Sequence, residues 1–190
     1  MAGELVFTVG HSTHSAERFI ELLRAADVTA VADVRSSPYS RFNPQFNKQD
    51  LKGALKRHEI AYAFVGQELG ARSSDPKCYC DGRVVYSRLA QTALFKNGLK
   101  RIRKGAQSYR IALMCAEREP LECHRTLLVS RYLAKDGVEI RHILASGHIE
   151  QHFDTETRLI KLAHQEIEWV ILGRQIAGSM HVRILSRRYS

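Results

Sequence analysis

The sequence predicts a single α/β domain in which a mostly parallel sheet carries helices on both faces. Its 190 residues fit one domain. Short apolar, β-branched runs alternate along the chain with segments of helical periodicity, as they do in folds built on parallel strands. The composition, 44% hydrophobic and 26% charged, is that of an ordinary globular protein.

The N-terminal part of the chain is predicted to form a strand, a helix and a second strand. Residues 5–9 are an apolar run that ends at Gly10. Ser15 can cap a helix at residues 15–26, which carries apolar side chains on one face. Residues 28–34 are apolar and β-branched, which is typical of a buried parallel strand.

The next part of the chain contains two loops around a helix and a strand. A polar loop at residues 35–47 precedes a helix at residues 49–58, where leucines lie four positions apart. Residues 60–65 are predicted to form the third strand. Residues 66–82 are rich in Gly, Ser, Asp and Cys, and a loop of this length is often functional or mobile.

Another helix, strand and helix follow. Residues 84–104 have helical periodicity with an interruption expected at Gly98. Residues 109–115 are predicted to form a strand. Residues 121–135 are predicted to be helical, because a proline suits the first turn and Gly137 suits the C-terminal stop.

A last strand at residues 138–143 and a helix at residues 153–169 complete the predicted domain, which spans residues 1–173. For the C-terminal tail, residues 174–190, a late strand, a dimer arm and a loose end all remain open. The sequence has no run of about 18 apolar residues and no features of a signal peptide. We therefore expect a cytoplasmic protein that does not interact with membranes.

The chain is basic, with a net charge of +9 and a pI of about 9.6. This excess favours acidic partners such as nucleic acid, nucleotides or a small anionic substrate. The basic residues gather at 48–57, at 96–104 and at Arg183, Arg187 and Arg188 in the tail. Much of this charge is expected on solvated helix faces, and the few aromatic residues do not interleave with it as in a single-strand stacking platform.

Reactive side chains follow several of the predicted strands. Open parallel sheets bind ligands beyond the carboxyl ends of their strands. The side chains expected at that edge are His11, Ser12, Asp33, Arg35, Cys115, Glu117, Cys123, His124, Arg125 and His142. Their convergence on one edge predicts a functional site.

The first two strand ends allow both functional and structural interpretations. Gly10 and Ser12 can serve a tight turn and a helix cap, or can form a backbone anion pocket with His11. Their spacing matches neither a dinucleotide fingerprint nor a Walker loop. Asp33 and Arg35 are two residues apart on a strand, so their side chains point the same way. They can form a structural ion pair, or they can orient a substrate or bind a metal.

The cysteines of the fourth strand end also allow several interpretations. Cys115 can be an inert buried thiol. Cys123 lies near a helix start, where the dipole and the neighbouring His124 and Arg125 lower a thiol pKa, although three nearby glutamates oppose them. Phosphatase chemistry is excluded, because the position that should be arginine in a Cys-x5-Arg loop is Leu121.

A bound metal is the remaining option at this segment. Soft and borderline ligands coincide there, although their spacing matches no standard zinc module. The potential ligands are Cys115, Glu117, Cys123 and His124. Cys78 and Cys80 have no second CxxC pair, so we expect two free loop thiols.

These motifs together resemble a bacterial and archaeal family, domain of unknown function 488. The resemblance covers about residues 7–147, and the Cys-Ala-Glu…Pro…Cys-His-Arg segment is its most specific part. The residues that carry it are Thr8–Ser12, Asp33–Arg35, Pro38, Ser40, Phe42, Asn43, Leu69, Gly70, Leu113–Glu117, Pro120, Cys123–Arg125, His142 and Ile143. It implies an α/β sandwich but no assigned activity, cofactor or substrate. The site residues that it implies are His11, Ser12, Asp33, Arg35, Cys115, Glu117, Cys123, His124 and Arg125.

The main hypothesis is an enzyme that acts on a nucleotide or nucleic acid at an anion-accepting pocket. Arg35 and Arg125 would hold the anion. Asp33 or Glu117 would act as general base or orient a water molecule, and Cys115 or Cys123 would be the nucleophile where one is needed. The other residues assigned to substrate binding are His11, Ser12 and His124.

Three alternatives stay open beside an enzyme. The protein can be a non-catalytic nucleic-acid-binding module, whose affinity would fall steeply with salt. It can be a metal-binding sensor. The cluster can also be an internal polar network that holds the edge of the sheet, since buried polar groups must be satisfied.

Overall fold

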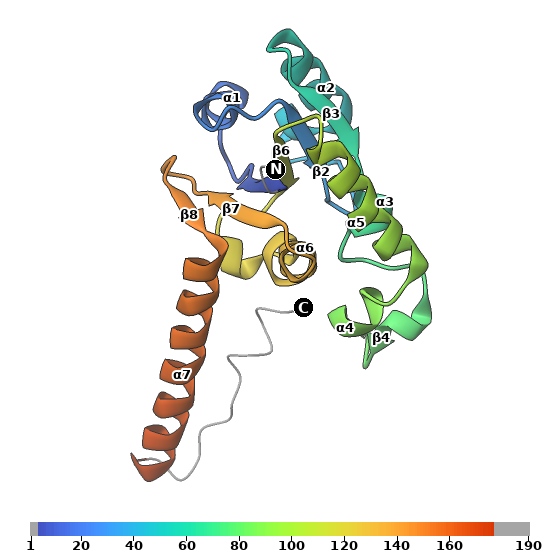
Figure 1. Cartoon of the computed structure of the whole chain (residues 1–190). Helices are drawn as coiled ribbons and strands as arrows, with labels where there is room; N and C mark the ends of the chain where they lie inside the picture. Colours follow the sequence, from blue (N-terminus) through green and yellow to red (C-terminus); the bar gives the residue numbers. More distant parts are fainter. Residues whose placement is uncertain (1–3, 177–190) are drawn as a thin grey trace.

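Five strands pair in parallel at the centre of the molecule. Helices cover both faces of this sheet, as the burial of its apolar side chains requires. The structure is a computed structural model that describes residues 4–176, and the side chains of residues 4–164. The sheet strands are β1 (Leu5–Gly10), β2 (Ala30–Asp33), β3 (Ala61–Phe64), β6 (Ile111–Cys115), β7 (Glu139–Ile143) and β8 (Ile149–Gln151). Their order is β3-β2-β6-β1-β7-β8, with β8 antiparallel to β7 (Figure 1).

Helices and short turns connect these strands. The α-helices are α1 (Ala16–Ala25), α2 (Lys48–Arg57), α3 (Gly66–Leu69), α4 (Tyr86–Leu89), α5 (Ala93–Ala106), α6 (Arg131–Lys135) and α7 (His152–Ile176). The 3-10 helices are η1 (Pro44–Phe46), η2 (Pro76–Cys78) and η3 (Pro120–Glu122), and η4 (Arg125–Ser130) is a π-helix. A small hairpin pairs β4 (Tyr79–Cys80) with β5 (Arg83–Val84).

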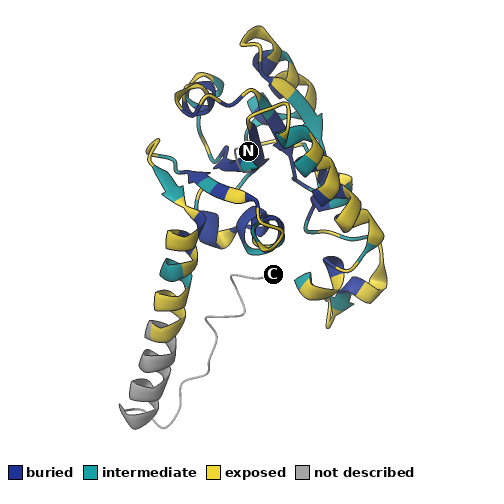
Figure 2. Ribbon diagram, in the orientation of Figure 1, coloured by how far each residue is buried: buried dark blue, intermediate teal, exposed yellow. Residues whose placement is uncertain are grey.

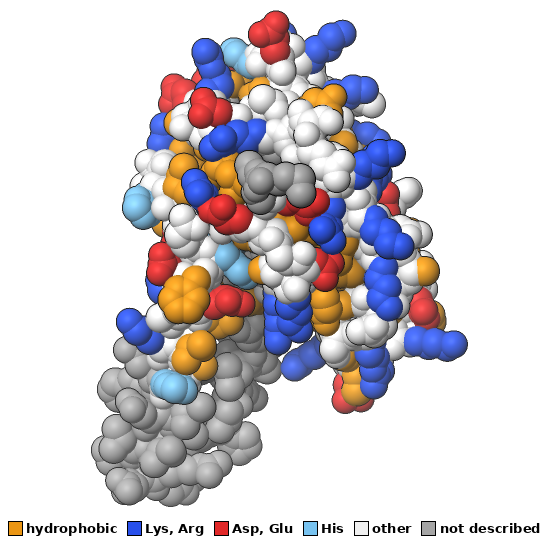
Figure 3. All heavy atoms as spheres, in the orientation of Figure 1, with side chains coloured by type: hydrophobic (Ala, Val, Ile, Leu, Met, Phe, Trp, Pro, Cys, Tyr) orange, Lys and Arg blue, Asp and Glu red, His pale blue; other side chains and the backbone are white. Residues whose placement is uncertain are grey.

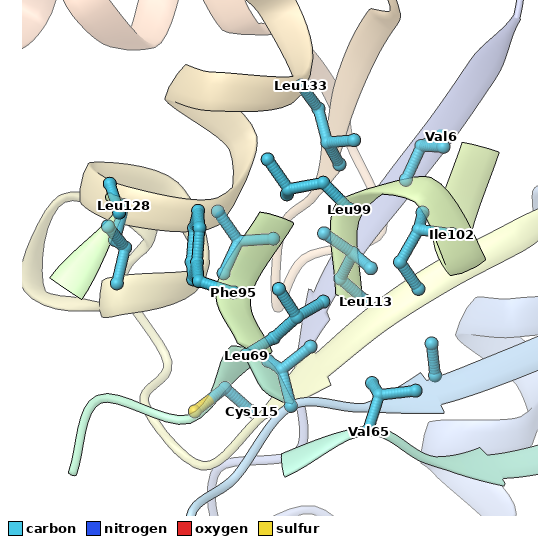
Figure 4. Packing of buried hydrophobic residues seen from close by; sticks show 14 of the residues in the cluster. Val6, Val65, Leu69, Phe95, Leu99, Ile102, Leu113, Cys115, Leu128 and Leu133 are labelled. Atoms are coloured by element: carbon cyan, nitrogen blue, oxygen red, sulfur yellow. The ribbon is translucent and has the colours of Figure 1, made fainter. Parts of the chain in front are cut away.

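Each face of the sheet has its own apolar cluster. On one face, α1 and α2 pack Phe19 and Leu55 against Phe7 and Met114. On the other face, α5, η4 and α6 pack against β1 and β6, with Leu113 among the buried residues (Figure 4). Buried residues concentrate on the strands and the inner helix faces, whereas the first turns of α7 are mostly exposed (Figure 2).

The chain leaves the adjacent strands β1 and β6 toward opposite edges of the sheet. From β1 it passes to β2, and from β6 it passes to β7. Gly10 pairs with Cys115, and the backbone N–H of His11 continues the ladder by donating to the Cys115 carbonyl over 2.9 Å. A side chain at Gly10 would collide with the Glu117 carbonyl, so glycine is required there. Such a topological switch is where open α/β sheets bind ligands.

The predicted fold class is confirmed, with differences in the second half of the chain. The loop at residues 66–82 contains α3, η2 and most of the β4–β5 hairpin. The helix predicted at residues 84–104 is broken before Thr92, whose hydroxyl caps α5 by accepting from Phe95 N, and not at Gly98. Gly98 instead lets α5 pack closely on Leu69, where a Cβ would clash.

The C-terminal third differs in two further respects. The helix predicted at residues 121–135 is interrupted, because it consists of η3, the wider π-helix η4 and α6. The strand β7 is not the last one, since the short edge strand β8 follows it.

The last predicted helix begins at His152 and continues to Ile176, so it includes the first residues assigned to the tail. Residues 177–190, with the tail arginines, lie outside the described residues. Within the part of the chain that the structure describes, no helix is both long and apolar enough to cross a bilayer.

Candidate functional site

The carboxyl edge of the sheet brings most of the predicted site residues into two adjacent groups. The first group, the arginine pocket, surrounds His11, Ser12, Asp33 and Arg35 at the ends of β1 and β2. The second group, the cysteine–histidine cluster, consists of Cys115, Glu117, Cys123 and His124. The two groups meet at Ala116, which lines the pocket while its neighbours in the chain belong to the cluster.

A buried ion pair forms the floor of the arginine pocket. Asp33 is fully buried and Arg35 is 5% exposed. Arg35 donates from Nε to Asp33 Oδ1 over 2.9 Å and from Nη2 to Oδ2 over 2.7 Å. The Arg35 backbone N–H and the Tyr62 hydroxyl donate to the same carboxylate over 3.1 and 2.8 Å. Asp33 thus accepts four hydrogen bonds, which suits positioning of Arg35 better than proton transfer.

Further contacts fix the Arg35 guanidinium in place. Nη2 also donates to the Phe46 carbonyl over 2.8 Å, and Nη1 lies 3.2 Å from His11 Nε2. Burial and the Asp33 carboxylate raise the pKa of Tyr62, which keeps its hydroxyl a donor. A guanidinium has five N–H groups. Among the contacts of the described residues, four of them are used, and one Nη1–H is left for the pocket that Arg35 lines.

His11 is held as a neutral ring of defined tautomer. Its Nδ1 donates to the Ser12 carbonyl over 2.8 Å, so Nε2 accepts from Arg35. The ring stacks on Phe46 at 4.3 Å between centroids. Burial lowers the pKa of His11 to about 4. The hydrogen bond to the Ser12 carbonyl opposes this shift, whereas the charge of Arg35 adds to it. His11 is therefore an acceptor that orients Arg35 at neutral pH.

Ser12 adopts an uncommon backbone conformation beside this ring. Its φ is +48°, in the left-handed region, and its N–H donates to the Ala116 carbonyl over 2.9 Å. Strained backbone of this kind clusters at functional sites. Ser12 does not cap α1, because Ser15 does so by accepting from Arg18 N.

The pocket above this floor has a volume of about 420 Å³ and no carboxylate among its lining residues. The lining is His11, Ser12, Thr13, Arg35, Ser37, Tyr39, Ser40, Asn43 and Ala116. Tyr39 is 70% exposed, and Phe42 on the same loop is 77% exposed with the Arg41 guanidinium over its ring at 4.6 Å. The pocket therefore offers hydrogen-bond donors below and an aromatic ring at its mouth.

The cysteine–histidine cluster lies on the other side of the β6 end. Cys115, Cys123 and His124 are buried, whereas Glu117 is exposed. His124 Nδ1 lies 3.6 Å from Cys115 Sγ and 4.0 Å from Cys123 Sγ, and the ring donates from Nε2 to the Val34 carbonyl over 3.0 Å. Cys123 Sγ donates to Glu117 Oε2 over 2.9 Å and accepts from the backbone N–H of Arg125 over 3.4 Å.

The electrostatics of the cluster separate its two thiols. A hydrogen bond from Cys115 to Cys123, together with burial, raises the pKa of Cys115. Burial opposes ionisation of Cys123, but the hydrogen bond from Cys115 and the charges of Arg125 and His124 outweigh it and hold the Cys123 pKa well below its usual value. Burial also opposes protonation of His124, yet the adjacent Cys123 raises its pKa. Cys123 is thus the thiol that ionises more easily, and Cys115 the one that resists ionisation.

Arg125 holds the loop that carries Glu117 of the cysteine–histidine cluster, and it does not line the arginine pocket. Its side chain is fully buried, and it donates to the Glu117 carbonyl over 2.7 Å and to the Arg118 carbonyl over 3.4 Å. Within residues 4–164 it forms no ion pair, and its Nε lacks a hydrogen-bond partner. Arg125 therefore lies outside the arginine pocket, and its role in holding an anion stays a prediction.

Other predicted residues lie apart from both groups. His142 is buried on β7, where its ring contacts Thr8 and His152. Cys78 is buried at the end of η2 and Cys80 is exposed on β4, and neither belongs to the cluster.

Sequence reasoning missed the partners of Arg35 and His124. Tyr62 had one usable signal, a hydroxyl in an otherwise apolar strand. The carbonyls of Phe46 and Val34 had none, because every residue carries that group.

A comparison with family models gives one match. Residues 15–132, more than half of the chain, match the family described as domain of unknown function DUF488. The matched stretch contains Asp33, Arg35 and the cysteine–histidine cluster, and it begins after Ser12. No curated protein and no solved structure matches the chain. The resemblance drawn from the sequence is thus confirmed.

Proposed function

The chain belongs to the DUF488 family, and from that premise we propose that it is an enzyme acting on a nucleotide-like substrate held in the arginine pocket. The observation that carries this proposal is the geometry of Arg35. Four contacts hold its guanidinium in place and leave one Nη1–H unused among the contacts of the described residues, and Arg35 lines a pocket that has no carboxylate in its lining. A guanidinium in a fixed orientation suits a phosphate or carboxylate oxygen.

The charge around the pocket supports an anionic substrate. Asp33 neutralises much of the Arg35 charge, so further cations are needed to attract an anion. Arg41 and Arg118 are exposed, and within residues 4–164 neither forms an ion pair. Arg41 lies on the pocket loop, and Arg118 lies two residues beyond Ala116 in the chain. Burial and then the charges of Arg18 and Arg118 lower the pKa of His14 in the same region.

The aromatic residues of the pocket loop support a nucleobase as the second recognised group. Tyr39 lines the pocket and is mostly exposed. A base that stacks on such a ring gains about 1–3 kcal/mol. The hydroxyl and amide groups of Ser37, Ser40 and Asn43 would then contact the sugar or the base edge.

Glu117 is the residue that fits a general base in this proposal. It is the exposed carboxylate at the junction of the two groups, whereas the Asp33 oxygens are occupied by Arg35 and Tyr62. Cys115 and Cys123 are buried, so in this proposal they do not attack a substrate in the pocket directly but act through the other groups of the cysteine–histidine cluster.

One observation favours a second candidate, a module that binds single-stranded nucleic acid without catalysis. Phe42 with Arg41 stacked on it, and Tyr39 three residues before it, form an exposed aromatic and basic surface. Lys and Arg side chains also line the side of the molecule where α5 lies (Figure 3). Alternating aromatic and basic groups are typical of proteins that bind single strands.

Binding titrations distinguish the two candidates. The four ribonucleoside monophosphates, their triphosphates and a short oligothymidylate would be titrated at low and at physiological salt, and each mixture analysed for products by chromatography. An enzyme for nucleotides should bind a mononucleotide and convert it. A single-strand binder should prefer the oligonucleotide and lose affinity steeply with salt.

Matched variants locate the binding site. Tyr39→Ala should weaken binding about 5- to 150-fold, the equivalent of 1–3 kcal/mol. Arg118→Ala should weaken it by up to about fivefold, and Lys100→Ala, which removes an exposed cation on α5, should leave mononucleotide binding unchanged. Glu117→Gln should stop conversion while binding persists. If neither nucleotides nor the oligonucleotide bind at low salt, the proposal is wrong.

A further inference from the structure

We propose that the cysteine–histidine cluster binds one Zn²⁺ ion, with two thiolates and an imidazole as buried ligands and the Glu117 carboxylate as a fourth, exchangeable ligand. Thiolate, imidazole and carboxylate are the side chains that zinc prefers. The inference does not depend on the nucleotide proposal, because metal content is measured without a substrate.

The positions of the four ligand atoms fit a tetrahedral ion. All of them lie within 4.8 Å of one another. Ligands of a tetrahedral zinc ion at 2.0–2.3 Å from the metal lie about 3.3–3.8 Å apart. His124 Nδ1 is 3.6 Å from Cys115 Sγ and 4.0 Å from Cys123 Sγ. Cys123 Sγ and Glu117 Oε2, now 2.9 Å apart, would have to separate slightly, and a pair at the 4.8 Å limit would have to approach by about 1 Å or a little more.

The contact behind the His124 ring orients it as a metal ligand. Nε2 donates to the Val34 carbonyl over 3.0 Å, which leaves Nδ1 directed at the two sulfurs. Histidine ligands commonly donate their second ring N–H to a backbone carbonyl in this way, which fixes both the tautomer and the orientation of the ring. The Arg125 backbone N–H, 3.4 Å from Cys123 Sγ, likewise supports a thiolate ligand.

The buried charge of Arg125 supplies an independent argument. A buried cation is costly unless an anion lies nearby. Arg125 is fully buried, and its guanidinium reaches only backbone carbonyls within residues 4–164. Two thiolates and one carboxylate around Zn²⁺ leave a single negative charge. That charge would balance Arg125, whose hydrogen bond to the Glu117 carbonyl also holds the ligand-bearing loop.

The exposure of the ligands indicates how the ion would be used. Cys115, Cys123 and His124 are buried, while Glu117 is exposed and next to the arginine pocket through Ala116. A structural zinc site is usually closed by four buried ligands, whereas a catalytic site keeps one position that a water or substrate can take. The Glu117 position is the one that can exchange here, and Glu117 could serve as the general base proposed above only when water or substrate has taken its place on the ion.

Metal analysis of the tag-free, full-length chain tests the proposal. The protein would be purified under reducing conditions without chelator, and its zinc measured by mass spectrometry. The metal would then be removed, and the chain titrated with Zn²⁺ and Co²⁺. We expect about one zinc per chain. Co²⁺ should give thiolate-to-metal charge-transfer absorption and the visible bands of a tetrahedral ion.

Two cysteine variants form a matched pair. Cys123→Ser should lose the bound zinc, whereas Cys80→Ser, which changes an exposed cysteine outside the cluster, should retain it. Glu117→Gln changes an exposed side chain, so it should fold even where the buried variant does not. It should weaken zinc binding at least about tenfold, because even the loss of a group that only hydrogen-bonds a metal ligand weakens binding by about that much. It should also alter the Co²⁺ spectrum.

Three results would overturn the proposal. The first is a folded wild-type chain that takes up neither Zn²⁺ nor Co²⁺. The second is equal zinc content in the Cys123→Ser and Cys80→Ser variants. The third is a Co²⁺ spectrum without thiolate bands. A chain that binds zinc but no nucleotide would support the metal site and contradict only the nucleotide function.

Discussion

Replacement of Asp33 by asparagine tests whether the ion pair under the pocket holds Arg35 in the fold. The side chain keeps its size but loses its charge. It then presents an amide N–H where Asp33 now accepts from Arg35 Nη2 at 2.7 Å or from Nε at 2.9 Å. The Arg35 guanidinium, 5% exposed, would remain buried without its counter-charge.

The magnitude follows from this burial. Removal of one partner of a buried, hydrogen-bonded ion pair costs about 3–5 kcal/mol. In a domain of this size, each kcal/mol lowers Tm by roughly 2–4 °C, so Asp33→Asn should lower Tm by about 6–20 °C. Urea denaturation followed by circular dichroism gives the free energy of unfolding directly.

Tyr62→Phe is the matched control for Asp33→Asn. It removes one of the four hydrogen bonds to the carboxylate and leaves the charges intact. A hydrogen bond to a charged group contributes about 1.5–3 kcal/mol, and less is expected here because Tyr62 is only half-buried. If Asp33→Asn costs no more than Tyr62→Phe, the ion pair does not stabilise Arg35 as reasoned.

Three further predictions concern stability, each measured by urea denaturation. Gly10→Ala should cost about 1–3 kcal/mol because the new Cβ collides with the Glu117 carbonyl. Gly53→Ala on α2, where a Cβ would make only an ordinary contact with Arg57, should stabilise by up to about 1 kcal/mol; equal stabilities would contradict this. Thr92→Ala should cost about 1 kcal/mol through loss of the α5 cap, and an unchanged midpoint would argue against that cap. Burial lowers the pKa of His142 from 6.5 to about 3, so between these pH values His142 is protonated in the unfolded chain but neutral in the folded chain. Stability should be full above pH 6.5 and fall toward pH 3, and His142→Gln should reduce that slope; an unchanged slope would contradict it.

The sequence was sufficient to predict that most of these side chains gather at the carboxyl edge of the sheet, because that placement follows from the order of the elements. Apolar runs define the strands, and parallel strands place their carboxyl ends on one edge. Asp33 and Arg35 are two residues apart, so they point the same way on any strand. Cys115 and Cys123 lie in one connected segment. For these residues, the order of the elements was sufficient to bring them together.

What the sequence could not predict depends on contacts between distant segments or on finer backbone geometry. The Phe46 and Val34 carbonyls that hold Arg35 and His124 have no side-chain signal. Helical periodicity does not distinguish a π-helix from an α-helix over one turn, so η4 was merged into a longer helix. Gly98 was interpreted as a helix break, although the glycine serves close packing against Leu69.

The Val34 carbonyl has a consequence for how the two groups respond to their ligands. Val34 lies between Asp33 and Arg35 in the chain, and its carbonyl binds the His124 ring. One peptide unit therefore connects the floor of the pocket to the cluster. If a substrate on Arg35 changes the zinc affinity by some factor, zinc must change the substrate affinity by the same factor, since linkage is reciprocal. Zinc titrations with and without nucleotide would measure that allosteric coupling.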